Sequence, residues 1–195
     1  MQIPKEKILK AALDILIRDG YAAVNIKTIA KELNCSTQPI SWHFGNMEGL
    51  RKALAEYAMD YANQKMISSA GGMDSFINVG GGYIHIAFDE PNLFRYLYMS
   101  GESGYHADGF DVLMNADDNA EIVEKLSQYL KIPKENAGRF VQNTIIYTHG
   151  LATFVVSGLI KSSKEQVMQM VMQAAVAFLA QAGADLEKLK EGMSK

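Results

Sequence analysis

The stretch "STQPISWHFGNMEGL", Ser36 to Leu50, places a proline, a tryptophan, a histidine and a phenylalanine between two segments with ordinary helical spacing. Ser36 is a typical N-cap residue, and Pro39 falls in the first turn, where a missing amide proton costs no intrahelical bond. Gly45 is a typical helix terminator, and Asn46 is placed to cap the next helix. The stretch therefore predicts a short helix from about Thr37 to Phe44.

Two further helices are predicted before this stretch. Apolar residues from Ile8 to Leu16 recur at the spacing of a buried helical stripe, and the pattern stops at Gly20. A second stripe from Ile26 to Leu33 follows Asn25, whose side chain is placed to accept the free amides of the first turn. Two short helices joined by a tight turn form a helix-turn-helix, in which the second helix enters the major groove of DNA.

The rest of the 195-residue chain also reads as helical, and about nine helices are predicted in all. The expected ranges are 46–69, 76–89, a helix restarting at Pro91, 119–130, 133–160 and 164–182. Three consecutive glycines, Gly80 to Gly82, interrupt the second of these and cost roughly 1 kcal/mol each relative to alanine. Either that helix is kinked, or another element approaches it very closely. The fold class predicted is all-α.

Charge is distributed unevenly along the chain. Residues 1–53 hold eight lysines and arginines against five acidic residues, whereas the whole chain has a net charge of −3. A basic head on an acidic body is a modest indication of a partner that touches only the head. The single cysteine, Cys35, excludes an internal disulfide framework and a cysteine-cluster zinc site. With neither a signal peptide nor a run of eighteen apolar residues, we expect a cytoplasmic protein that does not use a membrane.

The predicted short helix divides its side chains between DNA and the protein core. Residues at its N-terminus are placed to meet base edges, where a glutamine pairs with adenine and a proline ring contacts a thymine methyl; they are Thr37, Gln38 and Pro39. Donors placed for the phosphate backbone are Ser36, Ser41, Trp42, His43 and Asn46. Ile40 and Phe44, four residues apart, are expected to face inward. Without wider context, packing remains an alternative role for Trp42 and His43.

Residues Gly20 to Leu50 resemble the DNA-binding domain of the TetR family of transcriptional repressors. The positions that fit the family pattern are Gly20, Tyr21, Ile29, Ala30, Ser36, Ile40, Trp42, His43, Phe44, Asn46, Glu48 and Leu50. The resemblance implies a three-helix DNA-binding domain over 1–46 and a larger helical domain for ligand binding and dimerisation over 47–195, with 47–69 as the connecting helix. It also implies a homodimer that is released from a palindromic operator by a small, largely apolar ligand.

Three positions depart from the family pattern. Ser41 stands where the family usually has a phosphate-binding tyrosine, Gly45 where a lysine or polar residue is common, and Met47 where a lysine usually holds the DNA backbone. Because counterion release scales with the number of neutralised phosphates, we expect weaker affinity and a shallower salt dependence than in a typical relative. Lys27, together with Lys5 or Lys7, is expected to supply part of the missing charge.

The family resemblance also assigns candidates in the larger domain. Stripes on the last two long helices predict the dimer face, although each is equally compatible with intramolecular core; they comprise Phe140, Thr144, Thr148, Leu151, Val155, Val167, Met170, Val171, Ala174 and Phe178. Candidates to line an apolar ligand pocket with a few polar groups are Phe88, Phe94, Tyr98, Phe110, Tyr147 and His149. For each of these, simple core packing is the alternative.

Other classes of function find little support in the sequence. The histidines His85, His106 and His149 are too scattered to predict a metal site, and no cofactor motif occurs. No serine, cysteine or paired-carboxylate constellation with recognisable spacing predicts an enzyme, although helical enzymes can assemble sites from distant residues. A helical small-molecule-binding protein or enzyme with a vestigial helix-turn-helix head is the main alternative, and an activator or co-regulator that holds a protein partner is another.

Overall fold

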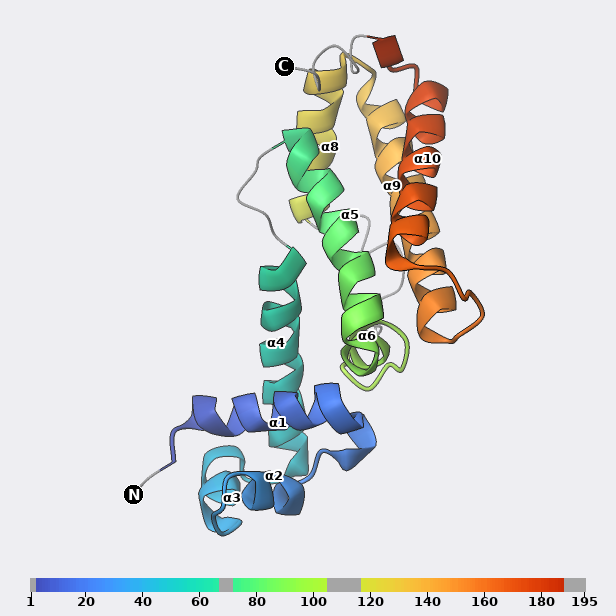
Figure 1. Ribbon diagram of the computed structural model, residues 1–195. Helices are drawn as coiled ribbons and strands as arrows, with labels where there is room; N and C mark the ends of the chain where they lie inside the picture. The colour runs from blue at the N-terminus through green and yellow to red at the C-terminus, as the bar shows by residue number, and fades with distance from the viewer. Residues whose placement is uncertain (1–2, 67–71, 105–116, 188–195) are drawn as a thin grey trace. The chain divides into compact units, whose positions relative to one another are not determined.

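The computed structural model describes residues 3–66, 72–104 and 117–187, in which every regular element is helical (Figure 1). The nine α-helices of these residues are α1 (Lys5–Asp19), α2 (Ile26–Glu32), α3 (Gln38–Phe44), α4 (Met47–Met66), α5 (Gly72–Asp89), α6 (Pro91–Tyr98), α8 (Asp117–Leu130), α9 (Lys134–Val156) and α10 (Lys164–Gln181). A 3-10 turn, η1 (Tyr21–Ala23), follows α1. The predicted all-α fold is confirmed.

The described chain divides into two compact units. The first comprises residues 1–65 and 89–107, and the second residues 66–88 and 108–195. The first unit therefore contains α6 together with α1 to α3 and α4 up to Lys65, so it is larger than the DNA-binding segment alone. The division into domains at residue 46, which rests on function and not on compactness, stays a prediction.

The core of the first unit forms around α1. Its apolar stripe is almost wholly buried, with Ile8, Ala12 and Leu16 fully shielded from solvent. Helices α2, α3 and α6 all pack on α1, as Figure 1 shows for the first two. The helix ends at Gly20, whose φ of 85° suits a residue without a Cβ, and the predicted end of the helix is confirmed.

A side chain from α6 completes this C-terminus of α1. The Asn92 amide nitrogen donates to the carbonyl oxygens of Ile17 at 3.0 Å and Arg18 at 3.4 Å. The last carbonyls of a helix have no partner within it, so Asn92 satisfies two groups that would otherwise need water. This contact joins α6 to the helix on which α2 and α3 rest.

Glu90, next to α6, joins this helix to α4 within the same unit. Its Oε1 accepts hydrogen bonds from the Tyr61 hydroxyl at 2.8 Å and from the Lys65 ammonium. Glu90 is only 8 % exposed, so the two donors compensate for a carboxylate removed from water. Burial raises the pKa of Tyr61, and the hydrogen bond to Glu90 raises it further.

The second unit is built on α8, α9 and α10. Its core holds buried side chains from all three helices and the loop between α8 and α9, and these are Leu126, Leu130, Ile132, Ala137, Phe140, Val141, Leu179 and Ala182. Helix α9 ends four residues before the predicted position because Gly158, at a φ of 74°, closes it with bonds from Gly158 to Val155 and from Leu159 to Phe154. Ser163 and Gln166 form a capping box that starts α10.

The three glycines of α5 do not interrupt the helix, which is continuous from Gly72 to Asp89. A Cβ on Gly82 would stand 2.7 Å from the Cα of Met66, the last residue of α4, and a Cβ on Gly81 would stand 3.2 Å from the Met168 terminal methyl. The alternative of a close approach by another element is therefore confirmed.

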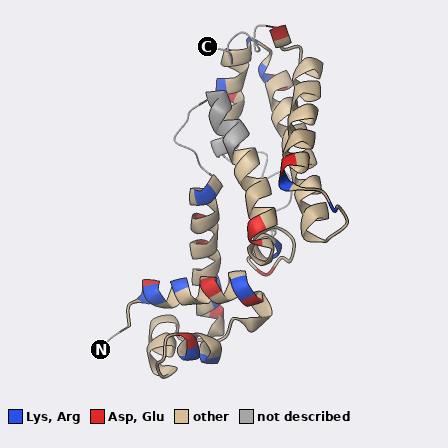
Figure 2. Ribbon diagram, in the orientation of Figure 1, with Lys and Arg blue, Asp and Glu red and all other residues tan. Residues whose placement is uncertain are grey.

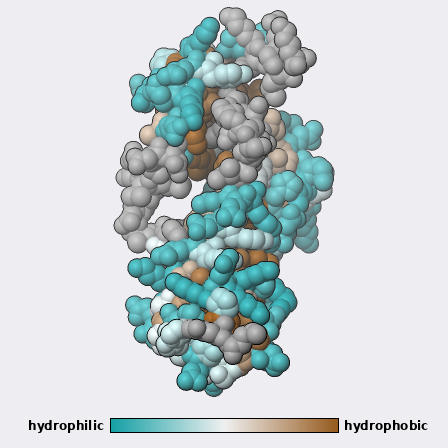
Figure 3. All heavy atoms as spheres, turned by 90° about the vertical axis from the view of Figure 1, so that its left-hand side faces the viewer, coloured by the Kyte–Doolittle hydropathy of each residue, from teal (hydrophilic) through white to brown (hydrophobic). Residues whose placement is uncertain are grey.

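Seen from the side drawn in Figure 3, the described surface is mostly hydrophilic, with small hydrophobic areas between hydrophilic ones.

Candidate nucleic-acid interface

The first half of the interface, α2, is fixed by its N-terminus. The Asn25 side-chain oxygen accepts hydrogen bonds from the backbone amides of Lys27 and Thr28, both at 3.0 Å, while the Thr28 hydroxyl accepts one from the Asn25 amide. This reciprocal capping box confirms Asn25 as the predicted N-cap. Ile29 and Ala30 are buried, which leaves Lys27 exposed on the outer side of the helix.

A tight turn leads from α2 into α3. Asn34 takes a φ of 50° within it, and the Cys35 amide donates to the Ala30 carbonyl at 2.9 Å. The prediction that Ser36 caps α3 is wrong: the N-cap position belongs to Thr37, and no side chain caps the helix. Pro39 gives a physical reason, since a proline has no amide proton to offer to a capping oxygen.

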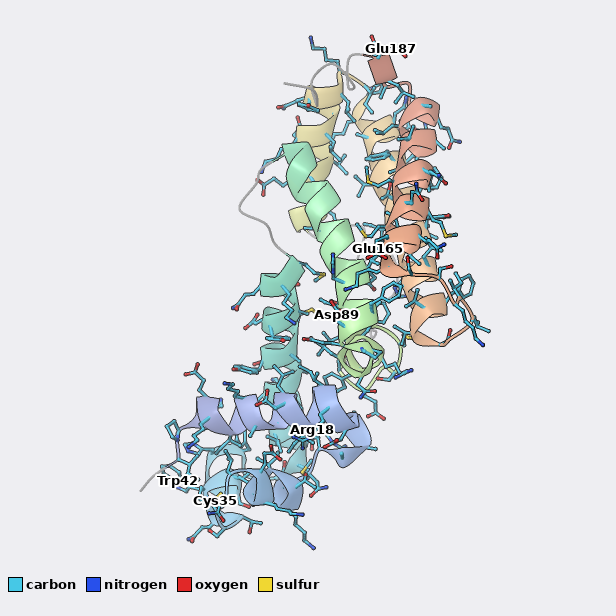
Figure 4. All side chains as sticks on the ribbon, viewed as in Figure 1. Arg18, Cys35, Trp42, Asp89, Glu165 and Glu187 are labelled. Atoms are coloured by element: carbon cyan, nitrogen blue, oxygen red, sulfur yellow. The ribbon has the colours of Figure 1, made fainter. Side chains whose placement is uncertain are left out.

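Helix α3 has one buried position and a solvent-exposed polar side. Ile40 is fully buried, as predicted, whereas the Trp42 side chain is 67 % exposed. Gln38 and Ser41 are exposed, and Pro39 is half-buried. Figure 4 shows Trp42 and Cys35 beside α2 and α3, at the part of the chain where the base-reading residues were predicted. The three predicted base readers, together with Ser41 and Trp42, therefore lie within six consecutive residues, 37–42.

The remaining predicted phosphate ligands have partners inside the protein. The His43 Nε2 lies 2.8 Å from the carbonyl oxygen of Ile3, and the Asn46 side-chain oxygen accepts a hydrogen bond from the Gly49 amide at 3.0 Å. Asn46 therefore caps α4, as predicted, and its side-chain nitrogen is the atom placed to donate outward. Phe44, expected to face inward, is half-buried, and the Lys5 ammonium lies 5.7 Å from its ring centroid.

Gly45 makes a turn between α3 and α4 that few other residues tolerate. Its φ of 73° and ψ of −63°, with a 2.8 Å hydrogen bond from the Asn46 amide to the Phe44 carbonyl, define a γ-turn of the rare strained type. The turn directs the Phe44 carbonyl oxygen to the place where a Cβ would stand at Gly49. Both glycines are therefore required by the backbone, which explains why the usual lysine or polar residue is missing at position 45.

Part of the positive charge of residues 1–53 is neutralised by ion pairs within the protein. The Arg18 guanidinium lies 3.1 Å from the Glu32 carboxylate and 2.9 Å from Asp19. Hydrogen bonds from Arg18 lower the pKa of the Glu32 carboxyl. Figure 2 shows basic and acidic residues interspersed along α1 and α2. Arg18 thus contributes less to an external anion than Lys27, Lys5 or Lys7, all of which are exposed.

The predicted ligand-pocket residues are distributed over both units. In the first unit, the Phe94 and Tyr98 rings lie with their centroids 5.1 Å apart, and burial raises the pKa of Tyr98 to about 12. In the second unit, the His149 Nδ1 lies 2.8 Å from the Tyr83 hydroxyl, a partner that no local sequence pattern indicated. Phe88 and Tyr147 also belong to the second unit. Phe110 lies outside the described residues.

The predicted dimer residues are mostly covered by the chain itself. Phe140, Thr144, Thr148, Leu151, Val167 and Val171 are buried, while Val155, Met170, Ala174 and Phe178 are half-buried. The exposed apolar side chains of these two helices lie elsewhere, namely at Ile146, Phe154, Met172 and Val176. Helical spacing identified the apolar stripes but gave no means of telling which of them faces the same chain.

Within residues 3–66, 72–104 and 117–187, no three His, Cys, Asp or Glu side chains gather closely enough to hold a metal ion. None of the helices in those ranges is long and apolar enough to cross a membrane.

A capped α2, a tight turn and an exposed polar α3 define a helix-turn-helix protein. Residues 8–54 match the sequence profile of the bacterial regulatory proteins of the tetR family. This segment of the chain is therefore similar to the N-terminal domain of that family. A search of curated protein sequences finds no match.

Solved structures of similar fold include several regulators of this family. One is assigned to the TetR-family transcriptional regulators of Rhodococcus sp., at a TM-score of 0.62 and 16 % identity, covering 89 % of this chain and 97 % of the other. A TetR-like regulator from Rhodococcus sp. RHA1 matches at 0.59 and 14 %, covering 91 % and 98 %. TetR-Q116A from Acinetobacter baumannii AYE, in complex with minocycline, matches at 0.54 and 14 %, covering 92 % and 98 %. The chain has their fold.

Proposed function

We propose that this chain is a homodimeric transcriptional regulator, and specifically a repressor that a small, largely apolar ligand releases from a palindromic operator. The observation that carries the proposal is the exposed polar surface of α3, with Ile40 buried beneath it and α2 fixed by its capping box. A short surface helix with Trp42 67 % exposed offers a ring to a partner and little to the protein's own core. A DNA-binding regulator suits this surface better than an enzyme does.

In this proposal the N-terminal part of α3 reads bases. The Gln38 amide forms a bidentate pair with an adenine edge, the Pro39 ring contacts a thymine methyl, and Thr37 contributes its hydroxyl. Phosphates are bound by Lys27, Ser36, Ser41 and Trp42, and by the side-chain nitrogen of Asn46. All five of these residues are exposed, whereas His43 is half-buried and its Nε2 already lies at the Ile3 carbonyl.

The dimer is supported by exposed apolar side chains on the last two helices. Ile146, Gly150 and Phe154 follow one another at four-residue spacing on α9, and Met172 and Val176 do so on α10. The four apolar side chains among them are 36 % to 50 % exposed, which is unusual for residues of this size. A second copy of the chain would cover them, and a palindromic operator requires two copies of α3 at the spacing of successive major grooves, about 34 Å.

Glutamates at Met172 and Val176 test this dimer. Sedimentation is expected to give a dimer for the wild type and a monomer for the double variant, because burying two carboxylates at an interface costs several kcal/mol. Gln128→Glu, at an exposed position of α8, is the matched control and should stay dimeric. A monomeric wild type would contradict the proposal.

Ligand release requires two arrangements of the protein, of which the ligand prefers the one that does not fit DNA. A similar structure was solved with minocycline bound, which supports a ligand for this fold as well. We propose that aromatic residues of the second unit, among them Phe88, Tyr147 and His149, contact it. Alanine at Tyr147 or Phe88 should then reduce the response to the ligand and leave DNA affinity intact.

The test of DNA binding uses Trp42, the only tryptophan in the chain. Its fluorescence is followed during titration with duplexes from the DNA flanking the gene, since such regulators often act on neighbouring genes. We expect a change with one duplex and weaker, less selective binding for Gln38→Ala with Pro39→Ala. Gln128→Ala is the control. Silence with every duplex would contradict DNA binding, and an unchanged operator preference would contradict the assignment of the base readers.

A further inference from the structure

The N-terminal segment of the chain is attached to the last turn of α3 at two points. The Ile3 carbonyl oxygen lies 2.8 Å from the His43 Nε2, and the Lys5 ammonium lies 5.7 Å from the centroid of the Phe44 ring. Pro4 between them is extended, with φ −63° and ψ 146°, and acts as the N-cap of α1. His43 and Phe44, which are neighbours in α3, thus contact the two ends of the segment Ile3–Lys5.

The first contact determines what His43 can do. A carbonyl oxygen only accepts hydrogen bonds, so the Nε2 of His43 must carry the proton. In the neutral imidazole, the Nδ1 is then an acceptor and has nothing to donate to a phosphate oxygen. Neutral His43 therefore serves the backbone of the N-terminal segment, and a phosphate contact of its own would require the imidazolium form.

The second contact brings a permanent positive charge to α3. No lysine or arginine occurs between Leu33 and Leu50, so the whole reading helix and both of its flanks lack one. Lys5, the first residue of α1, is exposed and reaches the Phe44 ring, where a cation is held by the electron-rich face of the ring. It is the cation that the described contacts attach directly to α3.

We propose that His43 and Phe44 hold the segment Ile3–Lys5 on α3 so that the Lys5 ammonium neutralises a DNA phosphate. Lys5 is then a DNA-binding residue, and His43 is a positioning residue that acts through it. This inference rests on the proposed function, because it names a phosphate contact of the same surface. Lys5 would thereby supply, next to α3, a positive charge that neither Met47 nor any residue of α3 carries.

The salt dependence of DNA binding tests the role of Lys5. The probe is a 20-base-pair duplex of arbitrary sequence, so that no operator needs to be known, and the pH is 8, above the range in which histidines usually titrate. Removing one phosphate contact lowers the slope of log affinity against log salt by about 0.9. In the proposed homodimer each subunit loses one contact, so we expect a decrease of about 1.8 for Lys5→Ala. We expect an unchanged slope for Lys10→Ala, an exposed lysine of the same helix.

A double-mutant cycle tests the role of His43. If His43 acts by positioning Lys5, His43→Ala lowers the slope in the wild type and has no further effect in Lys5→Ala. His43→Gln, whose amide can donate to the Ile3 carbonyl, should restore the wild-type slope. Thermal unfolding of each variant shows whether the DNA-binding segment is still folded. If His43→Ala does not fold, His43→Gln still tests the role of His43.

Each result has a definite meaning. An unchanged slope for Lys5→Ala overturns the inference, and so does an effect of His43→Ala that persists in full without Lys5, since His43 would then contact phosphate itself. A wild-type protein that binds no duplex, including those flanking its gene, contradicts the proposed function instead. Failure of the inference is therefore distinguishable from failure of the proposed function.

Discussion

Gly82 on α5 faces the Cα of Met66, the last residue of α4, and a Cβ on Gly82 would stand only 2.7 Å from that atom. Gly80 lies half a turn earlier in α5, and a Cβ added to it would have no atom of another element within 4 Å. Two glycines of one triplet therefore have opposite roles. One permits a close approach of two helices, and the other only weakens its helix.

This difference predicts opposite effects of alanine. Gly82→Ala should lower the free energy of unfolding by about 1–3 kcal/mol, because backbone atoms have to move apart. Gly80→Ala should raise it by about 0.5–1 kcal/mol through helix propensity alone. Urea unfolding of both variants measures the two effects, and equal changes of the same sign would contradict the described approach of α4.

The γ-turn at Gly45 predicts a conformational cost for any other residue. Gly45→Ala should lower the free energy of unfolding by about 1–3 kcal/mol, since its φ of 73° with a ψ of −63° is strained for a residue with a Cβ. Ser41→Ala, at an exposed position of the same helix, should change it by less than about 0.5 kcal/mol. An equally stable Gly45→Ala would mean that this turn relaxes at little cost.

The hydrogen bonds of Asn92 predict a stability role for a residue outside the DNA-binding segment. Asn92→Ala leaves the carbonyls of Ile17 and Arg18 without this donor, so the free energy of unfolding should fall by about 1–3 kcal/mol. Hydrogen exchange should increase at the C-terminus of α1 in particular. Arg95→Ala, which removes an exposed hydrogen bond to the Asn92 side-chain oxygen, serves as the control and should have a smaller effect.

Met47 predicts a gain of affinity on substitution. It is the first residue of α4 and half-buried, so a longer charged side chain can extend into solvent. Met47→Lys should steepen the salt dependence of duplex binding by about 1.8, since each subunit of the proposed dimer gains one phosphate contact, and it should tighten binding at low salt. Met47→Gln separates charge from polarity and should leave the slope unchanged. Equal slopes for the lysine and glutamine variants would show that no phosphate is within reach of position 47.

The head was predictable because its signals are local. Helical periodicity identified α1 and α2, and Asn25 precedes α2 in a cap whose bonds involve only residues 25 to 28. The cap of α3 was predicted wrongly at Ser36, since the outcome depends on how the turn enters the helix and on the missing amide proton of Pro39. The N-terminal contact of His43 spans 40 residues and has no local signal.

The larger domain was predictable only as a set of helices. Periodicity marks Phe140 and Thr144 as one apolar stripe, but a stripe packed within the chain has the same spacing as one packed against a second copy. The glycine triplet was more informative, because three glycines in a helix demand a reason. The sequence supplied two possible reasons, and only the position of Met66 distinguishes them.

The turn at Gly45 limits how this chain can change over evolutionary time. A chain that gains a cation at position 41 or 47 needs one substitution, whereas a cation at position 45 also needs a new backbone path and a different contact at Gly49. Adaptive routes toward tighter operator binding are therefore unequal in length. Selection for a stronger regulator would act on 41 and 47 first, and position 45 would be expected to keep its glycine.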